Sequence, residues 1–378
     1  MGKTAVVHDY FETADGGGKL SCLLAREAAS HLVCGYARAA HPYFPRVFSG
    51  PLFPLAPRVS VPFLRQLFLC FVFLSKGKRL AKYETVVFSG SYAPLAVLSG
   101  VAHRNILYCH TPPRFAYDQS AFFTRSVPAP LRAFFRVFLN WYRRQFEAAV
   151  TSMDVLVCNS QTVRRRIRRY LHRDAIVIYP PCETSLYSYR GQKNFYLSVA
   201  RLDRLKRVDR IIEAFRRMPE KRLVVVSAGP EEKHLRRLGE GLPNVVFLGT
   251  VGEDVLLELL GTCIAVIYIP KEEDFGMVPL EAMASGKPVI GVREGGVAES
   301  VIHEQTGLLL EPDSSVETLM DAVKNMTPEK ARALRGDCEA RAQNFDLGVF
   351  VQRMMALMDC RHTQVSTRNV SMGMRNLR

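Results

Sequence analysis

The chain has 378 residues, of which 48% are hydrophobic and 23% are charged. This composition excludes a disordered chain, and the length exceeds what one hydrophobic core usually organises, so we expect two globular domains. The net charge of +15 indicates an anionic partner. Nucleic acid, an acidic membrane surface and a phosphate-bearing substrate all fit that charge.

The amino terminus, MGKTAVVHDY, enters a strand-like run directly and lacks the basic, apolar and small-residue segments of a signal peptide. We therefore expect a cytoplasmic protein. The nine cysteines are odd in number and form no CxxC pair, which predicts reduced thiols and no metal site.

Short β-branched runs alternate with longer segments of helical period, a pattern typical of an α/β protein with parallel sheets. Two Rossmann-like sheets fit the two series of runs better than one long sheet. The predicted strands begin at Thr4, Thr85, Asn105, Asp154 and Ala175 in the first series, and at Phe195, Arg222, Asn244, Cys263, Pro288 and Gly307 in the second.

The domain boundary is predicted at the double proline 180–181, because consecutive prolines continue neither a helix nor a strand. We assign residues 1–181 to an N-terminal domain and residues 182–344 to a C-terminal domain. Residues 345–360 are expected to form a helix that packs back toward the N-terminal domain. Residues 361–378 are expected to form a polar tail.

The segment KEEDFGMVPLEAMASGKPVIG, from Lys271, carries two carboxylates, Glu273 and Glu281, separated by seven residues. Pro279 between them suits the first turn of a helix. The preceding glycine allows close approach of the backbone, so three successive amides can point at a phosphate or sugar oxygen. These amides belong to Gly276, Met277 and Val278. Taken by itself, a pair of glutamates is more often a solvated helix face.

Two cations, Arg201 and Lys206, lie five residues apart where a predicted strand ends and a helix follows. They can converge on one anion, the arginine as a bidentate fork and the lysine as a point charge. Diphosphate is a natural ligand for such a pair. The alternative is an exposed basic turn.

Two further polar segments follow predicted strands. The first, HDYFETADGGGKL from His8, contains a glycine-rich loop, but it matches neither the phosphate-loop spacing nor G-x-G-x-x-G, so a flexible turn is the default. The second, YCHTPPRFAYD from Tyr108, places His110 at the strand end, where sheets of this type bind ligands. A single histidine is nevertheless more often structural.

The stretch from Lys271 closely resembles the E-x-F-G-x-x-x-x-E signature of the retaining glycosyltransferases of family 4, the group 1 glycosyltransferases with the GT-B fold. This resemblance implies two Rossmann-like domains that face a central cleft. The first would bind the acceptor and the second the nucleotide sugar. It implies that Glu273 contacts the donor sugar hydroxyls and that Glu281 holds the nucleotide ribose, with Phe275 completing the donor-binding loop.

In the same family an arginine and a lysine at the spacing of Arg201 and Lys206 neutralise the donor diphosphate. The loop at Gly17 and Gly18 resembles the Gly-Gly loop that faces the donor phosphates. The string YCHTPPRFAYD resembles a segment of bacterial mannosyltransferases that build O-antigen or exopolysaccharide chains from GDP-mannose. By that resemblance His110 lies beside the donor sugar, and mannose is the expected sugar.

The chain has no Asp-x-Asp motif, the usual magnesium clamp of the other main glycosyltransferase fold. We therefore predict metal-independent transfer without a cofactor, in which the two cations stabilise the leaving diphosphate.

A membrane surface is a further expected partner. The apolar run of eight residues from Leu67 to Leu74 is shorter than the ~20 residues that span a bilayer, so it forms either a core helix or an interfacial helix. Arginine-rich stretches between residues 132 and 173 favour an anionic surface. Together they indicate a peripheral enzyme on the inner face of the cytoplasmic membrane, acting on a glycan linked to polyprenyl diphosphate.

Three other functions are considered. A nucleic-acid-binding protein would carry a recognisable binding module, and the sequence has none. A catalytically inactive GT-B scaffold is disfavoured because Glu273, Glu281, Arg201 and Lys206 are all intact. A UDP-sugar donor stays open, because base specificity is not legible in the sequence.

Overall fold

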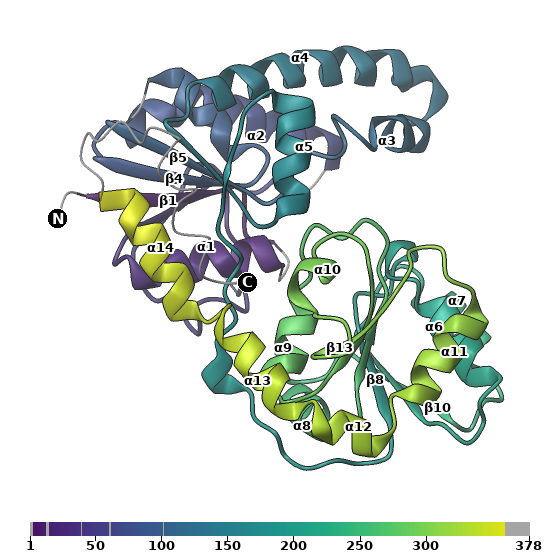
Figure 1. Cartoon of the computed structure of the whole chain (residues 1–378). Coiled ribbons are helices and arrows are strands. Elements are labelled where there is room, and N and C mark those ends of the chain that lie inside the picture. Colours follow the sequence, from purple (N-terminus) through teal and green to yellow (C-terminus); the bar gives the residue numbers. More distant parts are fainter. Residues whose placement is uncertain (1–2, 13–14, 39, 60–61, 101, 360–378) are drawn as a thin grey trace.

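The computed structural model describes residues 3–12, 15–38, 40–59, 62–100 and 102–359. Over these ranges the chain forms two domains, each built on one sheet in which all paired strands run parallel (Figure 1). The predicted polar tail, residues 361–378, lies outside the described residues.

The first domain contains a seven-stranded sheet in the order β3-β2-β1-β4-β5-β6-β7. The strands are β1 (Thr4–His8), β2 (His31–Cys34), β3 (Leu52–Pro54), β4 (Thr85–Ser89), β5 (Arg104–Cys109), β6 (Val155–Cys158) and β7 (Ile176–Val177). The helices are α1 (Gly16–Glu27), α2 (Pro62–Lys76), α3 (Ser120–Ser126), α4 (Arg132–Thr151) and α5 (Gln161–Leu171), with 3-10 turns η1 (Gly77–Leu80), η2 (Ala93–Ser99) and η3 (Ala129–Leu131). The central strands are apolar and almost wholly buried, as expected of a parallel sheet covered on both faces.

The second domain contains a six-stranded sheet in the order β10-β9-β8-β11-β12-β13. The strands are β8 (Tyr196–Val199), β9 (Leu223–Val226), β10 (Val245–Gly249), β11 (Val266–Tyr268), β12 (Val289–Val292) and β13 (Gly307–Leu310). The helices are α6 (Val208–Arg216), α7 (Glu232–Leu238), α8 (Glu253–Thr262), α9 (Val278–Ala284), α10 (Val297–Ser300), α11 (Val316–Asn325), α12 (Pro328–Ala333), α13 (Arg335–Gln343) and α14 (Leu347–Asp359), with 3-10 turns η4 (Thr184–Leu186) and η5 (Arg204–Lys206).

All eleven predicted strands are present, and the expected pair of parallel sheets is confirmed. Strands β2 and β3, which extend the first sheet at one edge, were not predicted. Strand β2 has four residues and β3 has three, so neither shows a readable period. Pro54 in β3 also argues against a strand, although proline is tolerated at the edge of a sheet.

The apolar run Leu67–Leu74 forms part of α2, and most of it belongs to the core of the first domain. Leu69, Cys70 and Phe73 are buried there, whereas Phe71 is exposed. Of the two predicted alternatives, this run therefore forms part of a core helix and not of a helix that lies on a membrane interface. No helix in the described ranges combines the length and the apolar character needed to cross a bilayer.

The last helix of the chain, α14, crosses back from the second domain to the first (Figure 1). Its buried side chains Phe350, Met354 and Met358 pack into the same cluster as β1, β4 and β5, and the Phe350 ring centroid lies 5.9 Å from that of Tyr108. A backbone hydrogen bond of 3.0 Å from Leu347 to Cys182 fixes the start of the helix. The chain thus connects the two domains twice.

We expect Phe350→Ala to lower the free energy of unfolding of the first domain by about 3–5 kcal/mol, because it removes a buried aromatic ring from that core. Urea unfolding followed by the emission of Trp141, the only tryptophan of the chain, measures this loss. The half-exposed neighbour in Val349→Ala serves as the control and should change little. A loss no larger than that of the control would contradict the packing of α14.

Candidate functional site between the two domains

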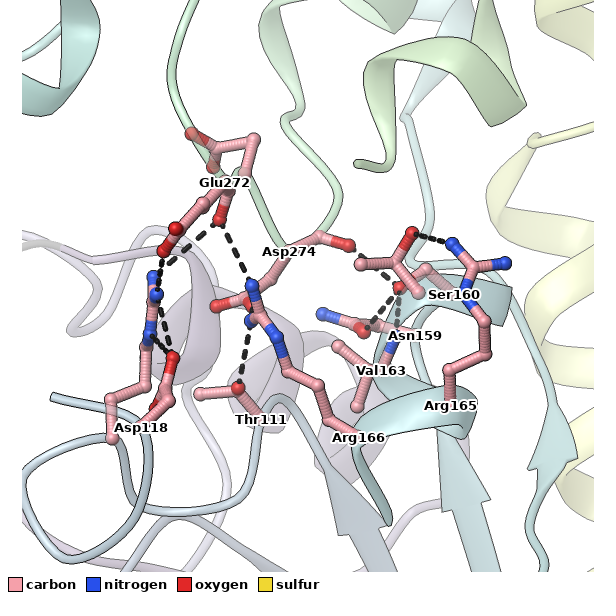
Figure 2. A network of polar contacts seen from close by, with 12 residues as sticks. Thr111, Asp118, Asn159, Ser160, Val163, Arg165, Arg166, Glu272 and Asp274 are labelled. Atoms are coloured by element: carbon pink, nitrogen blue, oxygen red, sulfur yellow. Dashed lines mark hydrogen bonds and ion pairs between the residues drawn. The ribbon is translucent and has the colours of Figure 1, made fainter. Parts of the chain in front are cut away.

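The loop between β11 and α9 contacts the first domain through charged groups (Figure 2). Arg114, at the carboxyl end of the sheet, places Nη2 2.5 Å from Oε2 of Glu272 and 2.8 Å from the carboxylate of Asp118. Arg166, on α5, forms an ion pair with Asp274 and donates to the carbonyl of Glu272 at 3.3 Å. Two arginines of the first domain therefore hold one short loop of the second.

The start of α5 adds hydrogen bonds from its backbone amides and from a serine hydroxyl to this interface. Ser160 caps α5 by accepting from the amide of Val163 at 3.0 Å, and its hydroxyl donates to the carbonyl of Asp274 at 2.6 Å (Figure 2). Glu299 of α10 accepts from the amides of Gln161 and Thr162 at 2.7 and 2.8 Å. A carboxylate from the second domain thus satisfies amides that an isolated helix would leave unpaired.

The same loop holds Glu273 against Lys206. The Lys206 ammonium lies 2.5 Å from Oε2 of Glu273 and 3.1 Å from the hydroxyl of Tyr268. Arg201 lies just beyond the end of β8, is exposed, and has no side-chain partner within the described ranges. The structure therefore brings Lys206 and Glu273 together and leaves Arg201 available to a ligand.

The loop geometry depends on glycines. Gly276 has a φ of +83°, and a Cβ atom there would lie 2.9 Å from the Tyr268 ring. Gly296 packs so closely on the loop that a Cβ atom would come within 2.1 Å of the Cα of Phe275. The Phe275 side chain is buried against Tyr179, with ring centroids 5.5 Å apart. Phe275 therefore anchors the loop from the core side, and only its backbone is left to face a ligand.

The chain from Gly276 through Met277 and Val278 starts α9, with Pro279 in its first turn as the sequence analysis expected. Amides at a helix start have no partner within the helix and are available to an anion. Within the described ranges we see no acceptor for the amides of Gly276 and Met277.

Glu281 lies inside α9, and burial raises the pKa of its carboxyl group. The charge of Lys19 and a hydrogen bond from Tyr187 oppose that shift. Lys19 belongs to the glycine-rich loop and helix α1 of the first domain, so this contact again crosses between the domains. The sequence analysis missed both partners, although Lys19 directly follows the glycines it singled out.

A polar cluster lies beneath the glycine-rich loop in the first domain. The Ser89 hydroxyl lies 2.8 Å from Nε2 of His110 and 3.3 Å from Nδ1 of His8, and Ser21 bonds to Ser89 at 2.9 Å. Burial lowers the pKa of His8 and of His110 to about 4, and a smaller contribution comes from the charge of His41 at His8 and from that of His8 at His110. Both imidazoles are therefore neutral near pH 7.

The predicted glycine-rich loop is instead the first turn of α1, and this turn covers the cluster. A Cβ atom at Gly17 would lie 3.3 Å from Nε2 of His110, so the helix backbone rests on the imidazole. The Gly18 amide donates to Oδ1 of Asp15 at 2.8 Å, which caps α1. Gly18 therefore has its amide occupied by the protein itself, whereas Gly17 lies directly beside His110. Asp15 has the structural role of a helix cap.

The chain is similar to several known proteins. Residues 188–345 match the family model described as Glycosyl transferases group 1. The Homo sapiens protein named Alpha-1,3/1,6-mannosyltransferase ALG2 is 28% identical over 244 residues, which cover 55% of this chain and 56% of that protein. The Bacillus anthracis protein named N-acetyl-alpha-D-glucosaminyl L-malate synthase is 29% identical over 157 residues, which cover 40% of this chain and 41% of that protein.

The chain spans little more than half the length of the first of these relatives. Among solved structures, Anabaena HepE in complex with UDP-glucose superimposes with a TM-score of 0.70 at 19% sequence identity, covering 94% of this chain and 98% of that one. The protein therefore has the GT-B fold. Residues 188–345, most of its second domain, resemble the group 1 glycosyltransferases.

The neutral histidines predict a pH dependence of stability. The folded protein keeps both imidazoles unprotonated down to about pH 4, whereas the unfolded chain takes up protons below its ordinary histidine pKa of about 6.5. The free energy of unfolding should therefore fall as the pH drops from about 7 to about 5, by up to ~1.4 kcal/mol per pH unit for each histidine.

His110→Gln should remove about half of this dependence, measured as urea midpoints at both pH values. The exposed histidine in His234→Gln provides the control and should leave the dependence unchanged. An undiminished pH dependence in His110→Gln would show that this imidazole is not buried in neutral form.

Proposed function

We propose that the protein is a retaining glycosyltransferase that transfers mannose from GDP-mannose to a lipid-linked glycan acceptor in cell-surface polysaccharide synthesis. The main support for this proposal is the ion pair of 2.5 Å between Lys206 and Glu273, together with the exposed Arg201 and the amides at the start of α9. The mannosyltransferase name of the human relative supports the sugar.

In this proposal the donor diphosphate lies against Arg201, Lys206 and the amides of Gly276 and Met277. These groups compensate the negative charge that grows as the leaving group departs, and they are already in place before the reaction. Glu273 contacts the hydroxyls of the donor sugar, and Glu281 holds the ribose. Gly17 and His110 approach the donor from the first domain.

The reaction breaks the bond between the anomeric carbon and the diphosphate oxygen, and forms a bond from that carbon to the acceptor oxygen on the same face. The acceptor proton passes to an oxygen of the departing diphosphate. The protein supplies charge compensation and positioning, and no side chain acts as a covalent nucleophile. We propose that neither a metal ion nor a cofactor takes part.

Neutral imidazole suits the proposed place of His110 beside the sugar, because a cation there would add to the positive charge developing at the anomeric carbon. Burial, and to a smaller extent the charge of His8, lowers the pKa of the ring, and the Ser89 hydroxyl contacts its Nε2 at 2.8 Å. We place the working enzyme at the inner face of the cytoplasmic membrane, where a polyprenyl-diphosphate-linked acceptor is found.

Thermal unfolding with GDP-mannose, GDP, UDP-glucose and UDP, each with a chelator present, tests the donor. A ligand that binds only the folded state raises the melting temperature, by an amount set by its concentration relative to its dissociation constant. We expect a shift with the two guanosine ligands. A shift confined to the uridine ligands would replace the donor while keeping the enzyme class, and no shift with any ligand would favour an inactive scaffold.

Two substitutions separate binding from turnover. Lys206→Ala should lower kcat by about 100-fold or more, because the cation compensates leaving-group charge chiefly in the transition state. Glu281→Ala should mainly raise the donor dissociation constant. The matched control is Lys193→Ala, an exposed lysine of the same domain that pairs with Glu258 at 3.0 Å. Wild-type kinetics in both Lys206→Ala and Glu281→Ala would refute the site.

A further inference from the structure

The arginine-rich region between residues 132 and 173 divides into two parts with different roles. On α5, Arg164 and Arg168 both pair with Asp174, and Arg166 pairs with Asp274. These three side chains pair within the protein, so this part of the run offers less free charge to an anionic surface than its composition suggests. The other part of the region lies on α4.

The outer face of α4 is apolar and exposed. Phe134 and Val137 are 70% and 69% accessible, and Trp141 follows them one helical turn later. Spacings of three and four residues place these side chains on one stripe of the helix. The opposite stripe, with Phe135, Phe138 and Tyr142, packs into the core. Helix α4 therefore carries two apolar faces, of which one has no protein to cover it in the described structure.

Helix α3 and the turn after it extend the exposed patch. Phe122 is 62% accessible, and Phe123 and Leu131 are also exposed. Arg132 holds this turn against the start of α4 by donating to the carbonyls of Val127 and Arg125 at 3.0 and 3.1 Å. Figure 1 shows α4 along the outer edge of the first domain, with α3 below one end of it, on the side toward the second domain. We refer to the exposed side chains of these elements as the rim patch: Phe122, Phe123, Leu131, Phe134, Val137 and Trp141.

The charge around the rim patch has a single sign. Five arginines and no aspartate or glutamate occur from residue 119 to residue 146. Arg125, Arg136 and Arg144 are exposed, and none of them is ion-paired within the described ranges. Arg144 lies three residues after Trp141 and so borders the apolar stripe of α4, whereas Arg136 is exposed further around the same helix. Aromatic side chains flanked by unpaired arginines match the interface of an anionic bilayer, where the rings enter the headgroup region and the cations meet lipid phosphates.

We propose that the rim patch docks the protein on an anionic lipid bilayer. A protein partner would have to supply matching carboxylates as well as an apolar surface, whereas one anionic leaflet supplies both. The docking would act directly on the site, because the segment that leads into α3 contains Arg114, which pairs with Glu272 of the second domain. Arg143 of α4 also donates to the carbonyl of Ala116 in that segment. This consequence for a lipid-linked acceptor rests on the proposed function, whereas the docking itself does not.

The experiment uses the full chain and vesicles of phosphatidylglycerol and phosphatidylcholine in equal parts, with vesicles of phosphatidylcholine alone for comparison. Trp141 is the only tryptophan and lies in the patch, so its emission should move to shorter wavelength when the anionic vesicles bind. Binding measured by flotation should weaken as salt is added, because the arginine contribution is screened. Arg136→Gln should weaken it roughly fivefold.

Phe134→Glu/Val137→Glu should weaken binding to anionic vesicles by ~100-fold or more, since it removes two inserted side chains and adds two charges that the lipid repels. The matched control is Leu248→Glu/Val255→Glu, which places the same charges on exposed apolar positions of the second domain. It should bind like the wild type. Circular dichroism and thermal unfolding confirm that both variants fold.

Several results would overturn the proposal. They are an unshifted Trp141 emission with anionic vesicles, equal binding to neutral vesicles, and equal loss of binding in both double variants. If the wild type does not bind vesicles but forms a dimer, and Phe134→Glu/Val137→Glu abolishes that dimer, the rim patch binds a second copy of the chain instead. Failure of vesicle binding with intact GDP-mannose binding rejects the docking alone. Vesicle binding without any nucleotide-sugar binding rejects the proposed function alone.

Discussion

The ion pairs from Arg114 and Arg166 to Glu272 and Asp274 are the interaction on which the candidate site depends. They flank Glu273 on both sides in sequence, so the residue nearest the proposed chemistry is placed by the first domain as well as by its own. Glu272 has a φ of +54°, which costs energy for a residue with a side chain and is tolerated because these contacts fix the loop. The position of Glu273 is therefore a property of the closed pair of domains. A second domain studied alone would lack two of the groups that define the loop.

The two domains supply different electrostatics to the space between them. The second domain contributes full charges, with Lys206 against Glu273 and a nearby exposed Arg201. The first contributes the cations Arg114, Arg166 and Lys19, and also groups that burial keeps neutral, namely His8 and His110 with the hydroxyl of Ser89 between them. Cations bind a diphosphate well because its charge is negative. Neutral hydrogen-bonding groups can bind the sugar hydroxyls without opposing the positive charge that develops at the anomeric carbon during transfer. In the proposed function, this division suits one ligand that has an anionic end and a polyhydroxylated end.

Sequence patterns were sufficient where local chemistry determines the structure. The eleven strands followed from β-branched runs, and the start of α9 followed from a glycine and a proline at fixed spacing. The pairing of Lys206 with Glu273 was not predicted, because it joins residues 67 positions apart. The same limitation hid Ser89, which is a plain serine in sequence and acquires a role only where two strand ends meet. His8 was within reach of prediction, since it ends a strand and precedes the glycine-rich loop.

The arginine run on α5 shows that composition alone does not reveal what a charged segment binds in the folded protein. A stretch such as VRRRIRRYLHR carries the same charge whether its side chains face a lipid or pair with carboxylates of the protein. Asp174 and Asp274 decide the matter for Arg164, Arg166 and Arg168, and only tertiary structure reveals those partners. The arginines of α4 share their helix with a single acidic residue, Glu147, and form no ion pair within the described ranges, and the same helix carries exposed aromatic rings. Charge alone did not distinguish the two helices, whereas charge together with uncovered apolar area does.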